Sequence, residues 1–146
     1  MLNLVKRTIT EEDLTYINYF ETLFGSEVLS FHKDPERNLI VYVLKPGEAR
    51  RIVLFRKKLL DKLKRLLKKN VLLLEYNPDL EQFILNIFFQ IKVKKVSIEN
   101  GKNGYRITVY VDPLQKGKAI GRDARNIKLA KEILSAYHNV ESLVIV

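Results

Sequence analysis

The segment Gly117-Lys118-Ala119-Ile120-Gly121-Arg122-Asp123-Ala124-Arg125-Asn126-Ile127 carries the most specific pattern in this chain. It places two glycines and several basic side chains between a short helical stretch and a longer one, about residues 124–137. Backbone N–H groups at the start of a helix attract phosphate, and glycine lets a ligand approach the backbone closely. The segment therefore predicts either a phosphate-binding turn or a solvated basic linker between two helices.

The elements on both sides of this segment follow one order, which occurs twice. Hydrophobic periodicity and turn residues predict each element. In the first half we expect a helix after Thr10, strands 27–32 and 39–44, an apolar stretch 51–55, a helix 57–69 and a strand 71–76. In the second half we expect a helix 79–90, strands 93–99 and 105–111, the segment with its helix 124–137, and a strand 140–146. Each half therefore reads helix-strand-strand-helix-helix-strand.

A shift of 67 residues superposes the two halves. Ile52 then falls on Ala119, Leu60 on Ile127, Leu63 on Ala130, and Leu67 on Leu134. The match lies in the hydrophobic pattern rather than in identity, and it indicates an internal duplication. We predict an α+β protein of two tandem units, residues 1–76 and 77–146, each with its helices packed on one face of a small sheet.

Local signals set the expected ends of several elements. Thr10 followed by three acids predicts a capped helix start, and Gly25 predicts its end. Asn77-Pro78-Asp79 predicts a second start, with Asn77 as the cap and Pro78 at the first helical position. The run from Asn100 to Gly104 predicts a hairpin turn, because Asn and Gly accept positive φ.

The segment and the element order together resemble the type II KH domain, and the tandem resembles the KH pair of NusA-like transcription factors of the short archaeal kind. The matching residues are Gly117–Gly121 with Arg125–Lys128 and, in the first half, Leu73–Asn77 with Glu81–Ile84. The resemblance runs from about residue 8 to the end. It implies binding of about four nucleotides of single-stranded RNA, with the glycine loop against the backbone.

The resemblance also implies which residues bind. Gly121, Arg122, Lys118 and Arg125 would face phosphate, and Ile120, Ile127 and the strand 105–111 would form an apolar groove wall. The residues expected to bind RNA are Lys116, Lys118, Ile120, Gly121, Arg122, Asp123, Ala124, Arg125 and Lys128, with Arg56, Lys57 and Lys58 in the first half.

Both loops depart from the family pattern Gly-x-x-Gly. Ala124 stands where the second glycine would be, which is a mild change if its φ is negative, and Asp123 would repel phosphate. The first half has Leu54-Phe55-Arg56-Lys57 at the equivalent place, with no glycine. Phe55 there could stack on a base, although core packing is the commoner role of such a residue.

The first half has a basic segment instead. Residues 45–69 hold eleven basic and two acidic side chains, a local charge of +9, which equals the net charge of the whole chain. Such a helix can contact several phosphates in a salt-dependent way. A solvated helix face, a duplex DNA-binding helix over 57–69, and an anionic membrane surface are the alternatives, the last disfavoured because the domain core needs the leucines.

Composition limits the other possibilities. The chain has 146 residues, 47% of them hydrophobic, which is enough for a packed core. Without cysteine it can form no disulfide and no zinc–thiolate site. Residues 1–10 lack the apolar region of a targeting signal. His32 and His138 lack metal-ligand spacing and are expected to be surface or strand-end residues.

We therefore expect a cytoplasmic, non-enzymatic RNA-binding protein without cofactor or metal, monomeric rather than oligomeric, acting in transcription elongation or termination. RNA polymerase is a further candidate partner. The alternative is a protein-docking module in which RNA binding is weakened, and exposed apolar groups around Leu54 and Phe55 would favour it.

Overall fold

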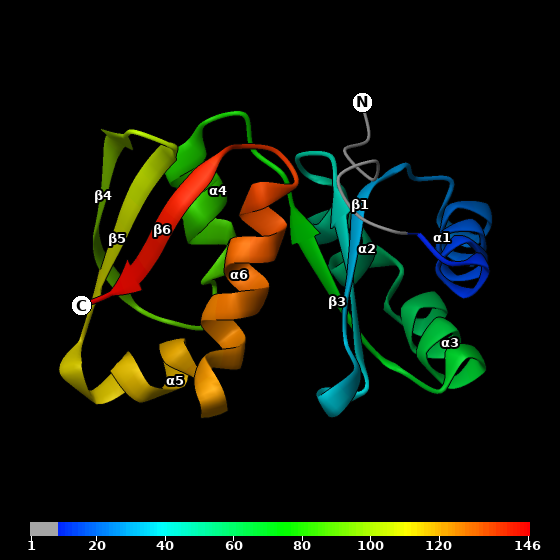
Figure 1. The fold of residues 1–146 in the computed structure, drawn as a ribbon. Helices are drawn as coiled ribbons and strands as arrows, with labels where there is room; N and C mark the ends of the chain where they lie inside the picture. The colour runs from blue at the N-terminus through cyan, green and yellow to red at the C-terminus, as the bar shows by residue number, and fades with distance from the viewer. Residues whose placement is uncertain (1–8) are drawn as a thin grey trace. The chain divides into compact units, whose positions relative to one another are not determined.

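The computed structural model describes residues 9–146, which form two compact units divided between Asn77 and Pro78. Both units are mixed α+β and have the same order of elements, each with a three-stranded sheet (Figure 1). The first unit comprises α1 (Glu11–Phe24), β1 (Val28–Asp34), β2 (Leu39–Leu44), α2 (Glu48–Phe55), α3 (Lys57–Leu67) and β3 (Asn70–Glu75). The second comprises α4 (Leu80–Ile87), β4 (Val93–Gly101), β5 (Gly104–Val111), α5 (Lys116–Ile120), α6 (Arg125–Ser135) and β6 (Val140–Ile145). The expectation about a targeting signal rests mainly on residues 1–8, outside the described part.

The two sheets share one topology. In the first unit β2 lies in the centre, antiparallel to β1 and parallel to β3. In the second unit β5 takes the central place, antiparallel to β4 and parallel to β6. A parallel pair needs a crossover, and the helix pairs α2–α3 and α5–α6 supply it in the two units.

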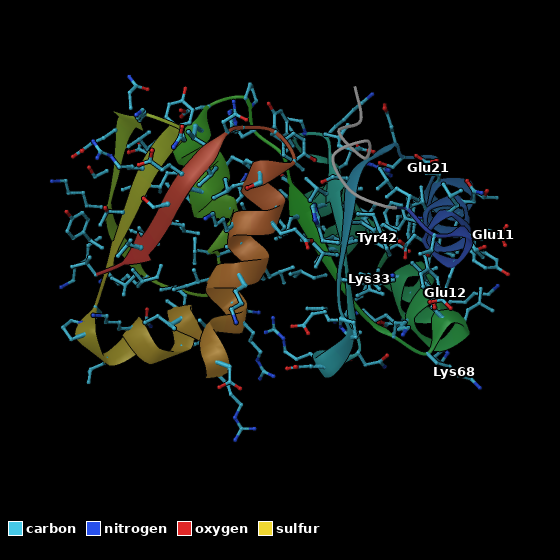
Figure 2. The ribbon with its side chains drawn as sticks, viewed as in Figure 1. Glu11, Glu12, Glu21, Lys33, Tyr42 and Lys68 are labelled. Carbon is cyan, nitrogen blue, oxygen red and sulfur yellow. The ribbon has the colours of Figure 1, made fainter. Side chains whose placement is uncertain are left out.

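The first unit builds its core between the sheet and the three helices. Tyr42 of β2 stacks on Phe20 of α1 with ring centroids 4.4 Å apart, and its hydroxyl donates to the carbonyl of Tyr16 at 2.8 Å. Figure 2 shows Tyr42 and Lys33 between the sheet and α1. The fully buried side chains of this core include Phe20, Phe31, Tyr42, Leu44, Ile52 and Leu63. This packing fixes α2 and α3 against the sheet.

The second unit has a smaller core of the same kind. Alternate residues of β5 point toward the helices, and Ile107, Val109 and Val111 are all buried there. They meet the apolar faces of α4 and α6, whose buried side chains are Phe83, Ile84, Ala130, Ile133 and Leu134. This core holds α6 in place and so fixes the segment that precedes it.

Several predicted signals are confirmed. Thr10 caps α1 in a reciprocal capping box with Asp13, and Gly25 ends that helix with φ +62°. The hairpin turn lies at Lys102 and Asn103, between the paired residues Gly101 and Gly104. The strand over residues 39–44 has its expected ends.

Other predicted ends are wrong for local reasons. Asp79 rather than Asn77 is the N-cap of α4, so Pro78 lies before the helix. The helix expected over residues 57–69 ends at Leu67 because Lys68 is left-handed, with φ +55°. The helix expected from Ala124 begins at Arg125 because Ala124 is also left-handed.

The prediction for His32 is wrong as well. Its side chain is fully buried in β1, and its Nε2 lies 2.9 Å from Ser30 Oγ. His138 is half-buried beside the ring of Tyr105, with centroids 6.0 Å apart. Across residues 9–146 no group of acidic, histidine or cysteine side chains could hold a metal ion.

Candidate nucleic-acid interface

The loop between α5 and α6 is shaped by Gly121. Its φ of +77° and ψ of +166° lie in a region that essentially only glycine occupies. Its N–H donates to the carbonyl of Gly117 at 2.8 Å and so ends α5. A Cβ at this position would lie 2.8 Å from Cγ and Nδ2 of Asn126, which is closer than contact distance. Both the backbone angle and the neighbouring side chain therefore require glycine.

The next turn of the loop is strained. Asp123 and Ala124 both have positive φ, +53° and +59°, in the left-handed region that non-glycine residues enter at a cost of about 1–2 kcal/mol. The condition for a mild Gly-to-Ala change, a negative φ at residue 124, is not met. Strain of this kind persists where the surroundings hold it, and it clusters at ligand-binding sites.

Asn126 closes the loop from the other side. Its side-chain Nδ2 donates to the carbonyl of Lys118 at 2.8 Å, which links the first turn of α6 to α5. The same side chain packs against Gly121. Our sequence reasoning did not assign Asn126 a role. The only available signal was an amide side chain in the first helical turn after a glycine, which is too common to single out.

Positive side chains surround this loop. Lys116, Lys118, Arg122 and Lys128 are exposed and Arg125 is half-buried, while Asp123 is the one acid among them. Within residues 9–146 no ion pair neutralises these cations. Lys118 alone has a weak bond, from Nζ to the carbonyl of Gln90 at 3.4 Å. The local field therefore favours an anion.

Arg125 adds a donor with no acceptor. Its Nε is shielded from solvent and has no hydrogen-bond partner in the described part of the chain. A buried donor without a partner costs about 1–3 kcal/mol. Arg125 is also the first residue of α6, where backbone N–H groups lack acceptors within the helix. An incoming anion would find both kinds of donor at this place.

The structure brings the nine predicted residues of the second unit together, within residues 116–128 on α5, the loop and α6. One part of the predicted groove wall, the strand 105–111, is wrong, whereas Ile120 and Ile127 are half-buried next to the loop and stay a prediction. Strand β5 lies in the centre of its sheet, and Ile107, Val109 and Val111 are buried beneath the helices. The strand beside α5 and α6 is β6, which is an edge strand; Leu143 and Ile145 are buried, and Val144 is exposed on the opposite face of the sheet.

Arg56, Lys57 and Lys58 lie in the first unit, at the junction of α2 and α3, and all three are exposed. This junction is a single residue, Arg56, whose φ is −128°. The corresponding connection in the second unit has four residues, Gly121 to Ala124. A junction so short leaves no loop that could wrap a phosphate.

The difference in length also corrects the superposition of the halves. The shift of 67 residues holds up to Ile52 and Ala119, which are both buried. Beyond the junction the buried pairs are Leu60 with Ala130 and Leu63 with Ile133, which are 70 residues apart. The pairing of Leu60 with Ile127 is therefore wrong, because three extra loop residues separate the helices in the second unit.

Phe55 and its neighbours are not core residues. The side chain of Phe55 is 77% exposed and that of Leu54 is 64% exposed, at the end of α2. The basic face of α3 is likewise in solvent, with only Leu60 and Leu63 buried in that helix. No helix within residues 9–146 is both long enough and apolar enough to cross a bilayer.

Comparisons with known proteins agree with this geometry. The family described as "NusA-like second KH domain" matches residues 80–144. A "Probable transcription termination protein NusA" of Thermoplasma acidophilum is 33% identical over 138 residues, which cover 93% of each chain. A protein of the same name from Methanococcus vannielii is 29% identical and covers 94% of this chain and 79% of its own length.

A solved structure is also similar along nearly the whole chain. The crystal structure of APE1850 has a TM-score of 0.76 and 31% sequence identity, and the match covers 94% of this chain and all of the other. The glycine loop falls inside the segment matched as a KH domain, and so does the sheet of the second unit except for Ile145 at the end of β6. From these likenesses it follows that this chain belongs to the NusA-like family in its short archaeal form.

Proposed function

We propose that this protein binds single-stranded RNA through the Gly121 loop of its second unit. The observation that carries the proposal is one loop that combines a glycine-only conformation, the start of α6 and five basic side chains. Amide groups at a helix start hold phosphate oxygens, and the cations add a long-range attraction. The unpaired Nε of Arg125 would gain an acceptor in such a complex.

The two units are, in this proposal, tandem KH modules over residues 1–76 and 77–146, with unequal roles. The second would position the RNA backbone, and bases would lie along the exposed edge of β6 beside α5 and α6. The first would add the basic surface that includes Arg56, Lys57 and Lys58. Phosphate contacts position a strand, whereas contacts with base edges confer sequence preference.

The setting we propose is transcription elongation or termination in the cytoplasm, with nascent RNA as the ligand. The support is membership in the NusA-like family and the names of its relatives. RNA polymerase remains a proposed partner, and the protein would act by binding rather than by catalysis. Monomeric behaviour, measurable by light scattering, is part of the same proposal.

The test compares two double variants of equal charge. Lys118→Ala with Arg122→Ala removes two cations at the loop. Lys102→Ala with Lys131→Ala removes two exposed cations outside the loop, one in the turn between β4 and β5 and one in the second half of α6. We expect the loop variant to bind short single-stranded RNA at least about tenfold more weakly, because it loses charge-assisted phosphate contacts. The control variant should bind almost as the parent does.

Fluorescence anisotropy with RNA pools, matched DNA and duplex DNA competitors gives the readout. A preference for RNA over DNA requires contacts that sense the 2′-hydroxyl. Equal losses of RNA affinity in the two variants would mean that RNA is bound by net positive charge and not by this loop. Stronger competition by duplex DNA than by single-stranded RNA would instead support the basic helix as a duplex-binding element.

A further inference from the structure

The C-terminal turn of α2 exposes three consecutive apolar side chains that the core does not use. Val53, Leu54 and Phe55 are 49%, 64% and 77% exposed. The helix contributes only Ala49 and Ile52 to the core of the first unit. Burying a large apolar side chain is worth about 1.5–3 kcal/mol, and these three leave that gain unrealised. The three side chains point in different directions around the last turn of α2, with Leu54 and Phe55 the most exposed. Exposed apolar side chains rimmed by polar residues are typical of an interaction surface.

The surroundings of this cluster are positive. Arg50, Arg56, Lys57 and Lys58 are exposed on α2 and at the start of α3. Within residues 9–146 none of these four side chains forms an ion pair. A surface with this charge attracts an acidic partner and repels a basic one.

The acids beside the cluster are already occupied. Hydrogen bonds from Arg51 hold the pKa of the Glu48 carboxyl below its usual range, and Arg51 Nε lies 3.1 Å from Glu48 Oε2. Glu75 Oε1 accepts a hydrogen bond from the backbone N–H of Arg50 at 2.8 Å. Within residues 9–146 neither acid forms an ion pair with Arg50, Arg56, Lys57 or Lys58.

The backbone here does not offer a second phosphate cradle. The N–H of Arg56 donates to the carbonyl of Ile52 at 2.8 Å, and the N–H of Leu60 donates to the carbonyl of Arg56 at 3.0 Å. Positive φ, which shapes the loop of the second unit, is absent at Arg56. Two of the three apolar residues are aliphatic and cannot stack on bases as aromatic rings do. These features favour a protein ligand over RNA bases at Val53, Leu54 and Phe55, whereas the neighbouring cations attract acidic proteins and RNA alike.

We propose that the α2 surface, formed by Val53, Leu54 and Phe55 with Arg50, Arg56, Lys57 and Lys58, binds an acidic segment of a partner protein through its apolar side chains. The apolar contacts supply the affinity, and the cations select acidic partners and speed association. A short amphipathic helix with acids beside its apolar face meets both requirements. The apolar side chains of this surface act independently of the RNA-binding loop in the other unit, whereas Arg56, Lys57 and Lys58 also belong to the basic surface proposed to attract RNA.

The experiment uses the full chain and a synthetic amphipathic peptide. The probe carries Leu and Phe on one helical face and Glu and Asp elsewhere; a second peptide has the same apolar face with Lys in place of the acids. The variant Leu54→Ser with Phe55→Ser removes the two most exposed anchors. Phe89→Ser with Leu114→Ser is the matched control, because these side chains are also exposed, in the second unit.

We expect the acidic peptide to bind, the Leu54/Phe55 variant to bind it at least about tenfold more weakly, and the control variant to bind it as the parent does. In NMR spectra of the full chain the peptide should shift the amide signals of α2 and the start of α3. The lysine peptide should bind at least about tenfold more weakly than the acidic one. RNA affinity of the Leu54/Phe55 variant should equal that of the parent.

Four outcomes would overturn the proposal. They are the absence of acidic-peptide binding, equal binding of the lysine peptide, equal losses in the two serine variants, and a loss of RNA affinity confined to the Leu54/Phe55 variant. The last would identify the α2 surface as an RNA contact, with Phe55 stacking on a base. Circular dichroism spectra equal to those of the parent confirm that each serine variant is folded.

Discussion

Two independent constraints require glycine at position 121, and each makes a separate contribution to the stability lost on substitution. Its backbone angles exclude a Cβ, and the side chain of Asn126 occupies the place where a Cβ would lie. We predict that Gly121→Ala lowers the free energy of unfolding by about 2 kcal/mol. The double variant with Asn126→Ala should lose less than the sum of the two single variants, because it removes the clash but keeps the backbone strain. Urea denaturation of the four proteins measures this coupling.

Two alanines serve as controls for that prediction. At Ala124 the left-handed backbone favours glycine by about 1 kcal/mol, and the greater freedom of glycine in the unfolded chain offsets most of this gain. Ala124→Gly should therefore change stability by less than about 0.5 kcal/mol. Ala136 has φ −68° and is buried, so Ala136→Gly should cost about 1 kcal/mol or more. Equal losses at residues 121, 124 and 136 would contradict the conformational argument.

These residue-level features also change how the loop is tested. The substitution Gly121→Asp would add a negative charge, backbone strain and a steric clash at once. A loss of RNA binding in that variant could therefore not be assigned to one cause. Arg122 is exposed, has negative φ and forms no ion pair in the described part, so its truncation removes a cationic donor without adding backbone strain or a clash. For this reason the charge variants leave Gly121 unchanged.

The first turn of α1 makes the stability of the fold depend on pH through the carboxyl group of Asp13. Asp13 closes the capping box with Thr10, and its Oδ1 accepts from Lys33 Nζ of β1 at 2.9 Å. Burial raises the pKa of the Asp13 carboxyl, but the hydrogen bonds from Lys33 and Thr10 outweigh burial and hold this pKa below its ordinary value. The carboxylate therefore stabilises the fold above the pKa of an unfolded aspartate, about 3.9.

We predict that this stabilisation is lost as the pH falls through the lowered pKa of Asp13. At neutral pH, Asp13→Asn should reduce the free energy of unfolding by about 2 kcal/mol, the usual loss for a hydrogen bond to a charged group. The difference between parent and variant should shrink on acidification below about pH 3.9. Thermal unfolding at several pH values measures it. A difference that stays constant with pH would mean that the charge of Asp13 contributes nothing.

The elements show which parts of the structure the sequence could predict. Strand 39–44 and the cap at Thr10 were predicted correctly because hydrophobic alternation and capping chemistry are local. The positive φ of Asp123 and Ala124 was not predicted, because no local preference puts an alanine there and the surrounding contacts impose it. Likewise, the burial of His32 depends on neighbouring elements rather than on residues beside it in the chain.

The candidate site was predicted in the same uneven way. Residues 116–128 lie in one stretch of chain, so their proximity followed from the sequence pattern. Which strand forms the groove wall did not follow from the sequence, because the choice between β5 and β6 depends on the strand order of the sheet. The role of Asn126 required knowledge of the angles at Gly121. Hydrophobic spacing also gave no sign that the loop of the first unit is three residues shorter.

At the scale of the whole molecule, positive charge is shared between the units rather than concentrated in one. The chain up to Asn77 has 15 basic and 10 acidic residues, and the remainder has 11 and 7, so the units carry +5 and +4. An attraction to polyanions therefore belongs to both units, whereas the strained glycine loop belongs to the second alone. The contribution of charge to RNA affinity should therefore fall as the salt concentration rises, whereas the contribution of the loop geometry should not.

We predict that two charge variants respond differently to salt. Lys57→Ala with Lys58→Ala removes exposed cations that act through counterion release, so its loss of RNA affinity should disappear as salt rises. Lys118→Ala with Arg122→Ala removes cations that would donate direct hydrogen bonds to a phosphate held at the loop, so part of its loss should persist at high salt. Because the variants lie in different units, their losses at low salt should add in the quadruple variant. RNA affinities from about 50 to 200 mM salt measure both effects. If the losses of the two variants vanish in parallel, the loop contributes charge alone and the glycine conformation serves the fold rather than the RNA.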